Sequence, residues 1–535
     1  MPCTPSLPIF TTIKMSKAVR GAAQLETLQN NTNPKWWKDA GLRRLLFWQG
    51  CVLVSQMTVG YDESVIGSLQ TMQPWVDDMG NPSSSDLGLI TAILFVGGVV
   101  GAFFASSLAD RYGRRASIAF GSFLCIVGTA LQSAAQGKGM FIGGRFIIGL
   151  GTSFTISAGP SLLNELSHPR MRGQIASTFN VLWYVGSIVA SWLTFGTGHL
   201  STTWSWRIPS IVQGAPSVFV IISTIFMPES PRFLYARGRT DEALAVLAEY
   251  HANGDYNDPL VVGELSQIAA ALELDAVSAA TSWRKILKSR PNRRRLGVVF
   301  AVAVLALWSG QSAISYYFSQ ILTSVGITAT NAQTGINGGM QIWNLLCSIT
   351  GVILAERLGR RPLWLISFVG MLCANVPLTI AAARYAAAGS SAAGYVTVVF
   401  MFLYNAAFNI ACNPLVYAYP AEILPYSIRT KGLGFFLVVA DALLVWNSYV
   451  NPIALERIGY WMFVCYAGFL AVAIGIIWQW FPETKGMTLE ELAELFTDDT
   501  EIIGIECGSQ SSKEDGRVTV VPKGVDEVEG KTIEA

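Results

Sequence analysis

Two charged residues inside apolar segments are the strongest candidates for chemistry in this sequence. Asp62 and Arg145 lie within long hydrophobic stretches, where an ionisable side chain is costly and usually functional. An aspartate held by an arginine is ionised, and protonation releases it. The pair can therefore couple a proton to helix movement, although an ion pair that merely fixes two helices is the alternative interpretation. Asp441 is another acid in an apolar stretch, and the sequence leaves its role open.

Enzymatic chemistry has little support in the sequence. Three histidines are present, His168, His199 and His251, and there is neither a glycine-rich phosphate loop nor a Ser/His/Asp grouping. The eight cysteines show no paired spacing and lie mostly in apolar runs, so they suit packing better than a disulfide framework or a metal site. The net charge of +1 gives no support for a nucleic-acid partner. We expect no catalytic residue, metal or cofactor.

Membrane-spanning helices are the elements that must hold these residues. Of the 535 residues, 51% are hydrophobic and 14% are charged, whereas soluble domains carry about 25% charged residues. A spanning helix needs about 20 mostly apolar residues, and strands are excluded because the apolar runs are long and continuous. The sequence predicts an all-α membrane protein with twelve spans, at 45–68, 87–109, 116–134, 140–163, 174–195, 207–227, 296–318, 335–355, 362–384, 393–417, 431–452 and 459–481.

Lys and Arg residues gather in every second connection between the predicted spans. Because basic residues near span ends stay on the cytoplasmic side, both termini and the long central loop are expected in the cytoplasm. In that loop, the residues from Thr240 to Glu242 precede an apolar pattern typical of a capped amphipathic helix. The expected units are an N-terminal tail (1–44), a first six-helix half (45–227), a central loop with short helices (228–295), a second six-helix half (296–481) and a C-terminal tail (482–535).

Charged motifs occur twice along the chain. The pattern acid, Arg, any residue, Gly, Arg, Arg at 110–115 returns at 356–361, and the pattern that begins Pro-Glu at 228–232 returns at 482–486. Topology signals alone would explain the arginines but not the interleaved acids and glycines. Each acid and Arg can bridge neighbouring helix ends and separate when that side opens. The residues of this candidate latch are Asp110, Arg111, Arg114, Arg115, Glu165, Arg172, Glu229, Arg232, Glu356, Arg360, Arg361, Glu422, Arg429 and Glu483.

Two six-helix halves with the same topology are a known transporter plan, with the substrate site between the halves at the bilayer midplane. Residues 45–497 resemble the sugar porter family of the major facilitator superfamily. The resemblance rests on Gly60-Tyr61-Asp62, Gly144-Arg145, Arg172-Gly173, both Gly-Arg-Arg loops and both Pro-Glu motifs. It implies the major facilitator fold, alternating access by rocking of the halves, and the charged motifs as a cytoplasmic latch. In this family an acid at the position of Asp62 is associated with proton symport.

Departures from the family pattern bear on the substrate. Ser106 and Leu162 stand where the loop motif and the span 4 motif usually have Gly and Tyr, and neither change should disable the latch. The Gln-Gln pair that hexose carriers place in span 7 falls on Ala306 and Leu307, and the Trp usual in span 10 is Tyr417. The pattern looks closer to the lactose and cellobiose permease-like branch, so a plain glucose carrier is not favoured.

Sugars are recognised by amides and hydroxyls that bond their OH groups and by aromatic faces, within a mostly apolar pocket. The resemblance aligns Asn180 with a sugar-binding Gln, Asn344 with a family Asn and Tyr417 with the span 10 position. Other residues at the same depth suit helix packing better, namely Trp183, Trp308, Trp446, Asn447 and Asn451. The full set of substrate-binding candidates is Asn180, Gln311, Ser312, Tyr316, Tyr317, Asn344, Asn413 and Tyr417.

We therefore predict a secondary active transporter that carries a sugar together with a proton by alternating access, as a monomer in the plasma membrane. A disaccharide or another non-glucose sugar is favoured. Two alternatives stay open. One is a major facilitator carrier for a non-sugar metabolite, importing a plant acid or exporting a secondary metabolite. The other is a non-transporting nutrient sensor, which would need a long cytoplasmic extension, and the tail at 482–535 leaves little room for one.

Overall fold

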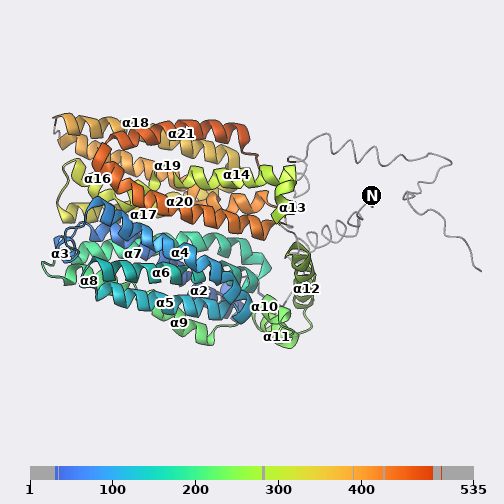
Figure 1. Ribbon diagram of the computed structural model, residues 1–535. Helices are drawn as coiled ribbons and strands as arrows, with labels where there is room; N and C mark the ends of the chain where they lie inside the picture. Colours follow the sequence, from blue (N-terminus) through green and yellow to red (C-terminus); the bar gives the residue numbers. More distant parts are fainter. Residues whose placement is uncertain are drawn as a thin grey trace, which may run out of the picture.

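Two bundles of long helices lie side by side in the computed structural model of this chain, with shorter helices at one end (Figure 1). The structure describes residues 31–33, 35–279, 283–388, 391–425, 428–485 and 496. All regular elements within these ranges are helices, which confirms the all-α prediction.

Six spans of the described chain make up the first bundle. They are α2 (Ala40–Leu69), α4 (Ser84–Tyr112), α5 (Arg114–Ser133), α6 (Lys138–Leu166), α7 (Arg172–Thr197), and the pair α8 (Trp204–Val212) and α9 (Ala215–Phe226), which together form one span. The short helices η1 (Trp36–Lys38), α3 (Gln73–Asp78) and η2 (Pro169–Met171) flank them. The break between α8 and α9 falls just before a proline in the first turn of α9, because proline lacks the N–H that would continue the helix.

The second bundle repeats this plan. Its spans are α14 (Arg290–Leu307) with α15 (Gln311–Tyr316), then α17 (Thr330–Leu358), α18 (Arg360–Ala388), α19 (Ser391–Ile423), α20 (Arg429–Ile458) and α21 (Trp461–Trp480), with the short α16 (Phe318–Ser324) after α15. Between α14 and α15 the chain turns at Gly310, whose φ of 96° is left-handed and suits glycine.

The described residues contain twelve spans, as the sequence predicts. Eleven are apolar enough to cross a membrane by length and composition, and α2, with 30 residues, is the twelfth. Its polar residues, such as Gln49, Gln56 and Asp62, lower its hydropathy. The helices also extend beyond the predicted bounds: α14 begins at Arg290 rather than at 296, because hydropathy marks the apolar part of a helix and not its polar end.

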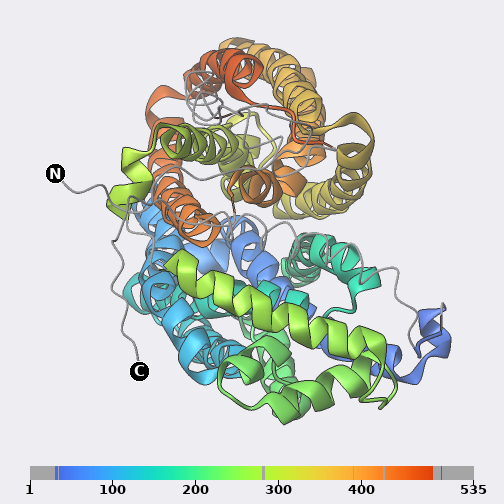
Figure 2. The ribbon, with the colours of Figure 1, turned by 90° about the vertical axis from the view of Figure 1, so that its right-hand side faces the viewer.

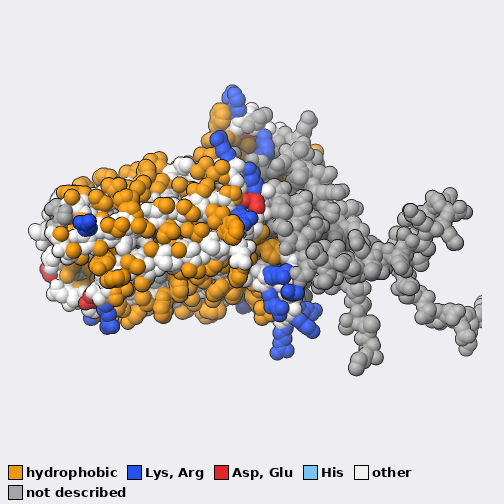
Figure 3. All heavy atoms as spheres, turned by 90° about the horizontal axis from the view of Figure 1, so that it is seen from above, with side chains coloured by type: hydrophobic (Ala, Val, Ile, Leu, Met, Phe, Trp, Pro, Cys, Tyr) orange, Lys and Arg blue, Asp and Glu red, His pale blue; other side chains and the backbone are white. Residues whose placement is uncertain are grey.

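Short helices of the central loop cover one end of the molecule, which we call the loop face; the other end is the opposite face. These helices are α10 (Pro231–Ala236), α11 (Thr240–His251), α12 (Pro259–Ala279) and α13 (Trp283–Lys288). The start of α11 at Thr240 confirms the predicted amphipathic helix but not its cap, because the N-cap residue is Arg239 and its side chain makes no capping hydrogen bond. Lys and Arg side chains gather toward the loop face, and the surface between the two ends is largely hydrophobic (Figure 3). Phe226, for example, is 69% exposed, as suits a side chain that faces lipid.

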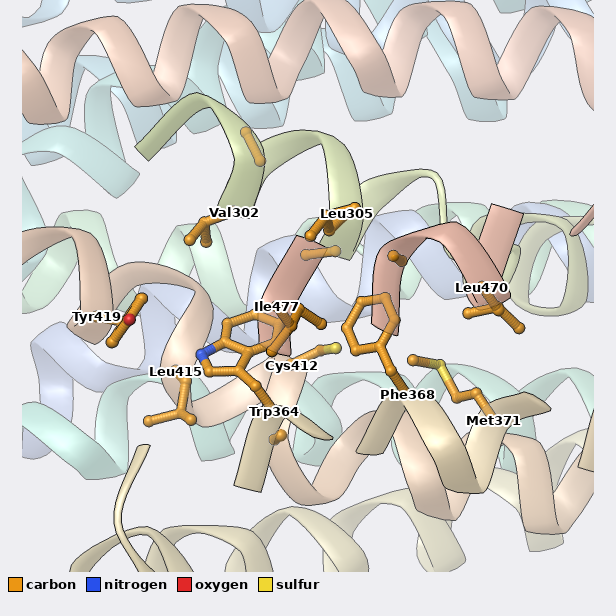
Figure 4. Close-up of a cluster of buried hydrophobic side chains, with 14 of the residues drawn as sticks. Val302, Leu305, Trp364, Phe368, Met371, Cys412, Leu415, Tyr419, Leu470 and Ile477 are labelled. Carbon is orange, nitrogen blue, oxygen red and sulfur yellow. The ribbon is translucent and has the colours of Figure 1, made fainter. Parts of the chain in front are cut away.

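Aromatic packing fills the core of the second half (Figure 4). The Trp364 ring lies 5.9 Å from Phe368 and 5.8 Å from Phe481. Cys412 is completely buried in the same cluster, as expected for a packing residue. The described cysteines are all free thiols, while Cys3 and Cys507 lie outside the described residues.

Glycines allow the helices of the first half to touch backbone to backbone. A Cβ atom at Gly60 would overlap the carbonyl of Trp183 on α7, and one at Gly186 would overlap the carbonyl of Met57 on α2. Gly149 meets α4 in the same way. Small residues permit such close approach in membranes, so the glycines of the span 1 and span 4 motifs fix how α2 and α6 sit.

The two halves meet through α4 with α20 and through α7 with α17. Seen from the loop face, they form separate groups (Figure 2). Toward the opposite face they approach closely. Thr330 Oγ1 donates to the carbonyl oxygen of Thr71 at 2.9 Å, and a Cβ atom at Gly88 would lie 2.7 Å from the carbonyl oxygen of Tyr449. The halves are therefore joined from their middle to the opposite face.

Candidate functional site

Asp62 and Arg145 lie next to each other inside the first half. Arg145 Nη1 lies 3.7 Å from Asp62 Oδ1, and each side chain is 1% exposed. Arg145 Nε also donates to the carbonyl oxygen of Ile90 on α4 at 2.8 Å. A separation of 3.7 Å exceeds hydrogen-bond length, so these two atoms attract through charge alone. The structure thus brings together the two residues that the sequence pairs.

Two glutamines complete the surroundings of Asp62. Gln213, at the junction of α8 and α9, donates to Asp62 Oδ1, and Gln132 Nε2 donates to Gln213 Oε1 at 3.1 Å. Among the described residues, none donates a hydrogen bond to Asp62 Oδ2. One carboxylate oxygen is therefore held by its neighbours, and the other is available to accept a proton.

Amide side chains form a seam between the helices of the second half. Asn405, Asn409 and Asn413 of α19 are four residues apart, so they share one face of that helix. Their partners are, in the same order, Gln311 Nε2 at 2.7 Å, Asn344 Oδ1 at 3.1 Å and Ser348 Oγ at 2.7 Å. Three predicted binding residues, Gln311, Asn344 and Asn413, thus meet on this seam.

The seam continues into the first half. Tyr184 of α7 donates its hydroxyl to Asn409. Nearer the opposite face, Asn337 Nδ2 of α17 donates to Ser68 Oγ at 3.1 Å and to Ser191 Oγ at 3.0 Å. Polar groups therefore cross the boundary between the halves at the depth where a transport site is expected.

Asn180 and Tyr417 keep accessible surface near this boundary. Asn180 on α7 is half-buried. Tyr417 on α19 is 48% exposed, and its ring packs edge-on against Phe436 at 5.6 Å. An accessible amide and an accessible ring are the groups that a sugar needs.

Other predicted residues serve packing instead. The Tyr317 hydroxyl donates to the carbonyl oxygen of Ser448, and its ring is 1% exposed. Ser312 is buried on α15. The remaining aromatic and amide residues pack within the second half, with Trp308 6.5 Å from Trp446 and 6.3 Å from Phe469, Asn447 donating to the carbonyl of Leu307, and Asn451 accepting from Tyr466.

Arg114 forms the centre of a charged cluster where the first half meets the loop face. Its Nε lies 3.1 Å from Glu165 Oε2, and its Nη1 lies 3.5 Å from Asp110 Oδ1. Glu229 accepts hydrogen bonds from the backbone N–H groups of Arg114 at 3.2 Å and Arg115 at 3.3 Å. The Glu229 carboxylate therefore caps the first turn of α5, where a negative charge is favourable.

The second half repeats this cluster. Arg360 Nη2 lies 2.9 Å from Glu422 Oε1, and Glu483 accepts from the backbone N–H groups of Arg360 at 2.9 Å and Arg361 at 3.1 Å. Burial raises the pKa of Glu229. Burial acts in the same direction on Glu483, but four backbone N–H donors outweigh it and lower its pKa. The two clusters share a geometry, each within its own half, yet differ in how firmly the capping acid holds its charge.

The remaining latch residues lie around these clusters. Arg172 Nη2 and Arg429 Nε each donate to a backbone carbonyl at the end of the preceding helix, at 3.4 and 3.2 Å. The Arg111 guanidinium lies over the neighbouring Tyr112 ring, and Arg232 lies in α10. The side chain of Glu356 lies outside the described residues.

The family described as "Sugar (and other) transporter" matches residues 49–496. The chain belongs to this family. Sugar (and other) transporters similar to it include the rice (Oryza sativa subsp. japonica) "Sugar transport protein MST7", 26% identical over 473 residues that cover 83% of this chain and 90% of that protein. The Bacillus subtilis "Putative metabolite transport protein YncC" is 32% identical over 453 residues that cover 82% of this chain and 91% of that protein.

Among solved structures, the inward-open xylose transporter XylE from E. coli matches this member of the family with a TM-score of 0.70. The match covers 85% of this chain and 100% of that chain at 19% identity, so it concerns the fold. Family and fold together confirm the major facilitator arrangement of twelve spans. The relatives are transporters, and this family member is a transporter rather than an enzyme.

Sequence reasoning missed three polar residues of this transporter. Glu63, directly after Asp62, accepts a hydrogen bond from Tyr316 across the boundary between the halves. Asn405 and Asn409 belong to the amide seam. A signal existed for each: Glu63 is an acid in an apolar span, and the two asparagines precede Asn413 at helical spacing.

Two histidines join the loop-face helices to the first half. His251 of α11 contacts Glu264 of α12 through Nδ1 and the carbonyl oxygen of Leu166 through Nε2, at 2.5 and 3.1 Å. The His168 ring lies 5.2 Å from that of His251. Burial lowers the pKa of His168 to about 3. Burial also acts downward on His251, but the charge of Glu264 and the hydrogen bonds to Glu264 and Leu166 together outweigh it and raise the pKa of His251.

An apolar cavity of about 430 Å³ lies on the first half, apart from the polar candidates. Its lining consists of Val54, Met57, Tyr61, Val189, Val212, Ala215, Pro216 and Phe219. The Tyr61 hydroxyl is already used, since it donates to the carbonyl oxygen of Pro209 at 2.8 Å. This cavity therefore offers a sugar few hydrogen bonds.

Proposed function

We propose that this transporter is a symporter that imports a sugar together with a proton by alternating access. The observation that carries the proposal is the buried pair of Asp62 and Arg145. Unit charges 3.7 Å apart attract by about 4 kcal/mol at an effective dielectric constant of about 20. A proton that neutralises Asp62 removes this attraction, which is large enough to change how α2 sits against α6.

A sugar as the substrate is supported by the family and by the chemistry of the seam. The rice relative is named as a sugar transport protein. Amides such as Asn344 and Asn409 lie at the boundary between the halves, and Asn180 and Tyr417 add an accessible amide and ring. These groups suit hydroxyl-rich solutes.

A disaccharide or another non-glucose sugar is the favoured cargo. Ala306 and Leu307 stand where hexose carriers of the family have glutamines, and Ala306 is 1% exposed within the apolar core. Neither side chain can bond a sugar hydroxyl. This difference favours the lactose and cellobiose permease-like branch.

The orientation that we propose follows from the distribution of Lys and Arg. Lys and Arg gather at the loop face, and such residues stay on the cytoplasmic side. The loop face and both tails would then lie in the cytoplasm, with the opposite face outside the plasma membrane. The charged clusters around Arg114 and Arg360 are proposed to act as the cytoplasmic latch, and the protein to work as a monomer.

Asp62→Asn tests the coupling. Uptake of a panel of labelled sugars is measured, with and without a proton uncoupler, in cells that lack their own carriers. The variant should lose uncoupler-sensitive accumulation and keep exchange of sugar across the membrane. Asp77→Asn is the matched control, because Asp77 is an exposed acid on α3 that accepts a hydrogen bond from the nearby Gln73 side chain at 2.8 Å, which asparagine can still accept. Proton-driven accumulation of sugar that persists in Asp62→Asn would contradict the role of Asp62 in proton coupling.

A further inference from the structure

Glu63 is an acidic side chain between the two halves to which the proposed proton coupling gives no role. It follows Asp62 on α2, and neighbouring residues of a helix point about 100° apart. Asp62 faces Arg145 inside the first half, whereas Glu63 faces the second half. There the Tyr316 hydroxyl of α15 donates to Glu63 Oε2 at 3.3 Å.

Accessibility sets Glu63 apart from its neighbours. Tyr61 and Asp62 are each 1% exposed, whereas Glu63 is half-buried. Trp183 of α7, whose backbone carbonyl packs against Gly60 of α2, is also half-buried, as is Asn180 one turn earlier on that helix. The Glu63 carboxylate thus shares its surroundings with an aromatic ring and an amide, which are the groups that recognise a sugar.

Acids outnumber bases around Glu63 in the described part of the chain. Asp62 directly precedes Glu63 on α2, and Asp441, on α20 of the second half, is half-buried with its carboxylate facing Gly98 of α4 across the boundary between the halves. Arg145 is already paired with Asp62 and with a backbone carbonyl. The carboxylates around Glu63 would repel a solute that carries a negative charge. Hydroxyl or ammonium hydrogens would instead find acceptors there.

We propose that Glu63 determines the charge selectivity of the transport site. Its carboxylate accepts hydrogen bonds from the hydroxyls of a neutral sugar or from the ammonium group of an amino sugar, and it excludes sugar acids. This inference rests on the proposed sugar transport, and it argues against import of a plant acid by the same site.

Glu63→Gln isolates the charge, because glutamine keeps the length of the side chain and one acceptor oxygen. Exchange of labelled lactose, lactosamine and lactobionate is measured in proteoliposomes without a proton gradient. The wild type should exchange lactose and lactosamine and exclude lactobionate. In Glu63→Gln the ratio of lactobionate to lactose exchange should rise at least tenfold, and the ratio of lactosamine to lactose should fall.

Glu249→Gln is the control, since Glu249 is a 55% exposed acid on α11, and its ratios should equal those of the wild type. Exchange needs no gradient, so a failure of proton coupling leaves this measurement intact. Ratios in Glu63→Gln within twofold of the wild type would overturn the assignment even if sugar exchange persists. If Glu63→Gln loses all exchange, Glu63→Asp decides: exchange of lactose with exclusion of lactobionate supports the proposal, and equal exchange of lactobionate and lactose overturns it.

Discussion

Gly88→Ala is expected to open the opposite face of the transporter. Gly88 lies near the start of α4, where a Cβ atom would lie 2.7 Å from the carbonyl oxygen of Tyr449 and 3.2 Å from its Cα. Tyr449 belongs to α20 of the second half. Backbone atoms cannot turn aside as a flexible side chain can. An alanine must therefore push α4 and α20 apart at the end where they join the halves.

The size of the effect follows from the contact. Ordinary contact begins near 3.4 Å, so the helices must separate locally by about 0.7 Å. Overpacking of this kind costs roughly 1–3 kcal/mol. In the conformation that is open at the opposite face, α4 and α20 are farther apart there, so part of this cost is absent. We expect its equilibrium to shift by about 1–2 kcal/mol, which is roughly 5- to 30-fold.

Alkylation of a cysteine at the boundary measures this opening. Ser68 is completely buried and accepts a hydrogen bond from Asn337 across the halves, so Ser68→Cys reports access from the opposite face. With a membrane-impermeant maleimide, labelling should be at least about fivefold faster when Gly88→Ala is added. Gly143→Ala is the control, because a Cβ atom there meets nothing within 4 Å. Labelling of Ser68→Cys that is unchanged or slower with Gly88→Ala would refute the proposal that the alanine separates α4 from α20.

Other substitutions have equally definite outcomes. Burial lowers the pKa of His168 to about 3. Below about pH 6.5, His168 is therefore protonated in the unfolded chain but stays neutral in the folded protein. Thermal stability should fall below that pH by up to ~1.4 kcal/mol per pH unit, and His168→Asn should flatten the curve. Glu483→Gln should lower stability more than Glu229→Gln, by about 1 kcal/mol, because Glu483 keeps its charge more firmly; equal losses would contradict this. Asn180→Ala and Asn344→Ala should each raise the apparent KM of sugar uptake about tenfold, a loss of one hydrogen bond, at unchanged expression. Affinity unmoved in both would show that the pocket is wrong.

Much of the fold could be predicted because apolar length and charge repeats are local properties of the sequence. The twelve spans and the helix at Thr240 follow from composition and spacing. The helix breaks within the sixth and seventh spans could not be predicted in this way. They depend on a proline at the start of α9 and on left-handed Gly310, and neither interrupts the hydropathy pattern.

The candidate site was predictable where a residue is unusual for its surroundings. Asp62 and Arg145 stand out as charges in apolar segments, and they prove to be neighbours. Whether a polar residue faces the boundary or a backbone carbonyl depends on helix rotation. Tyr316 and Tyr317 are adjacent in sequence, yet one bonds Glu63 and the other bonds a backbone carbonyl on α20. The family pattern could not separate them.

The two adjacent acids of α2 allow this helix to respond to both the proton and the sugar. Asp62 ties α2 to the first half through Arg145, and Glu63 ties the same helix to the second half through Tyr316. In the proposed mechanism a proton on Asp62 weakens the ion pair with Arg145, and a sugar that bonds Glu63 replaces the hydrogen bond from Tyr316. Either ligand alone leaves one of these two interactions in place. Movement of α2 relative to α6 of its own half and to α15 of the second half is then favourable only when proton and sugar are bound together, which is the condition that symport requires.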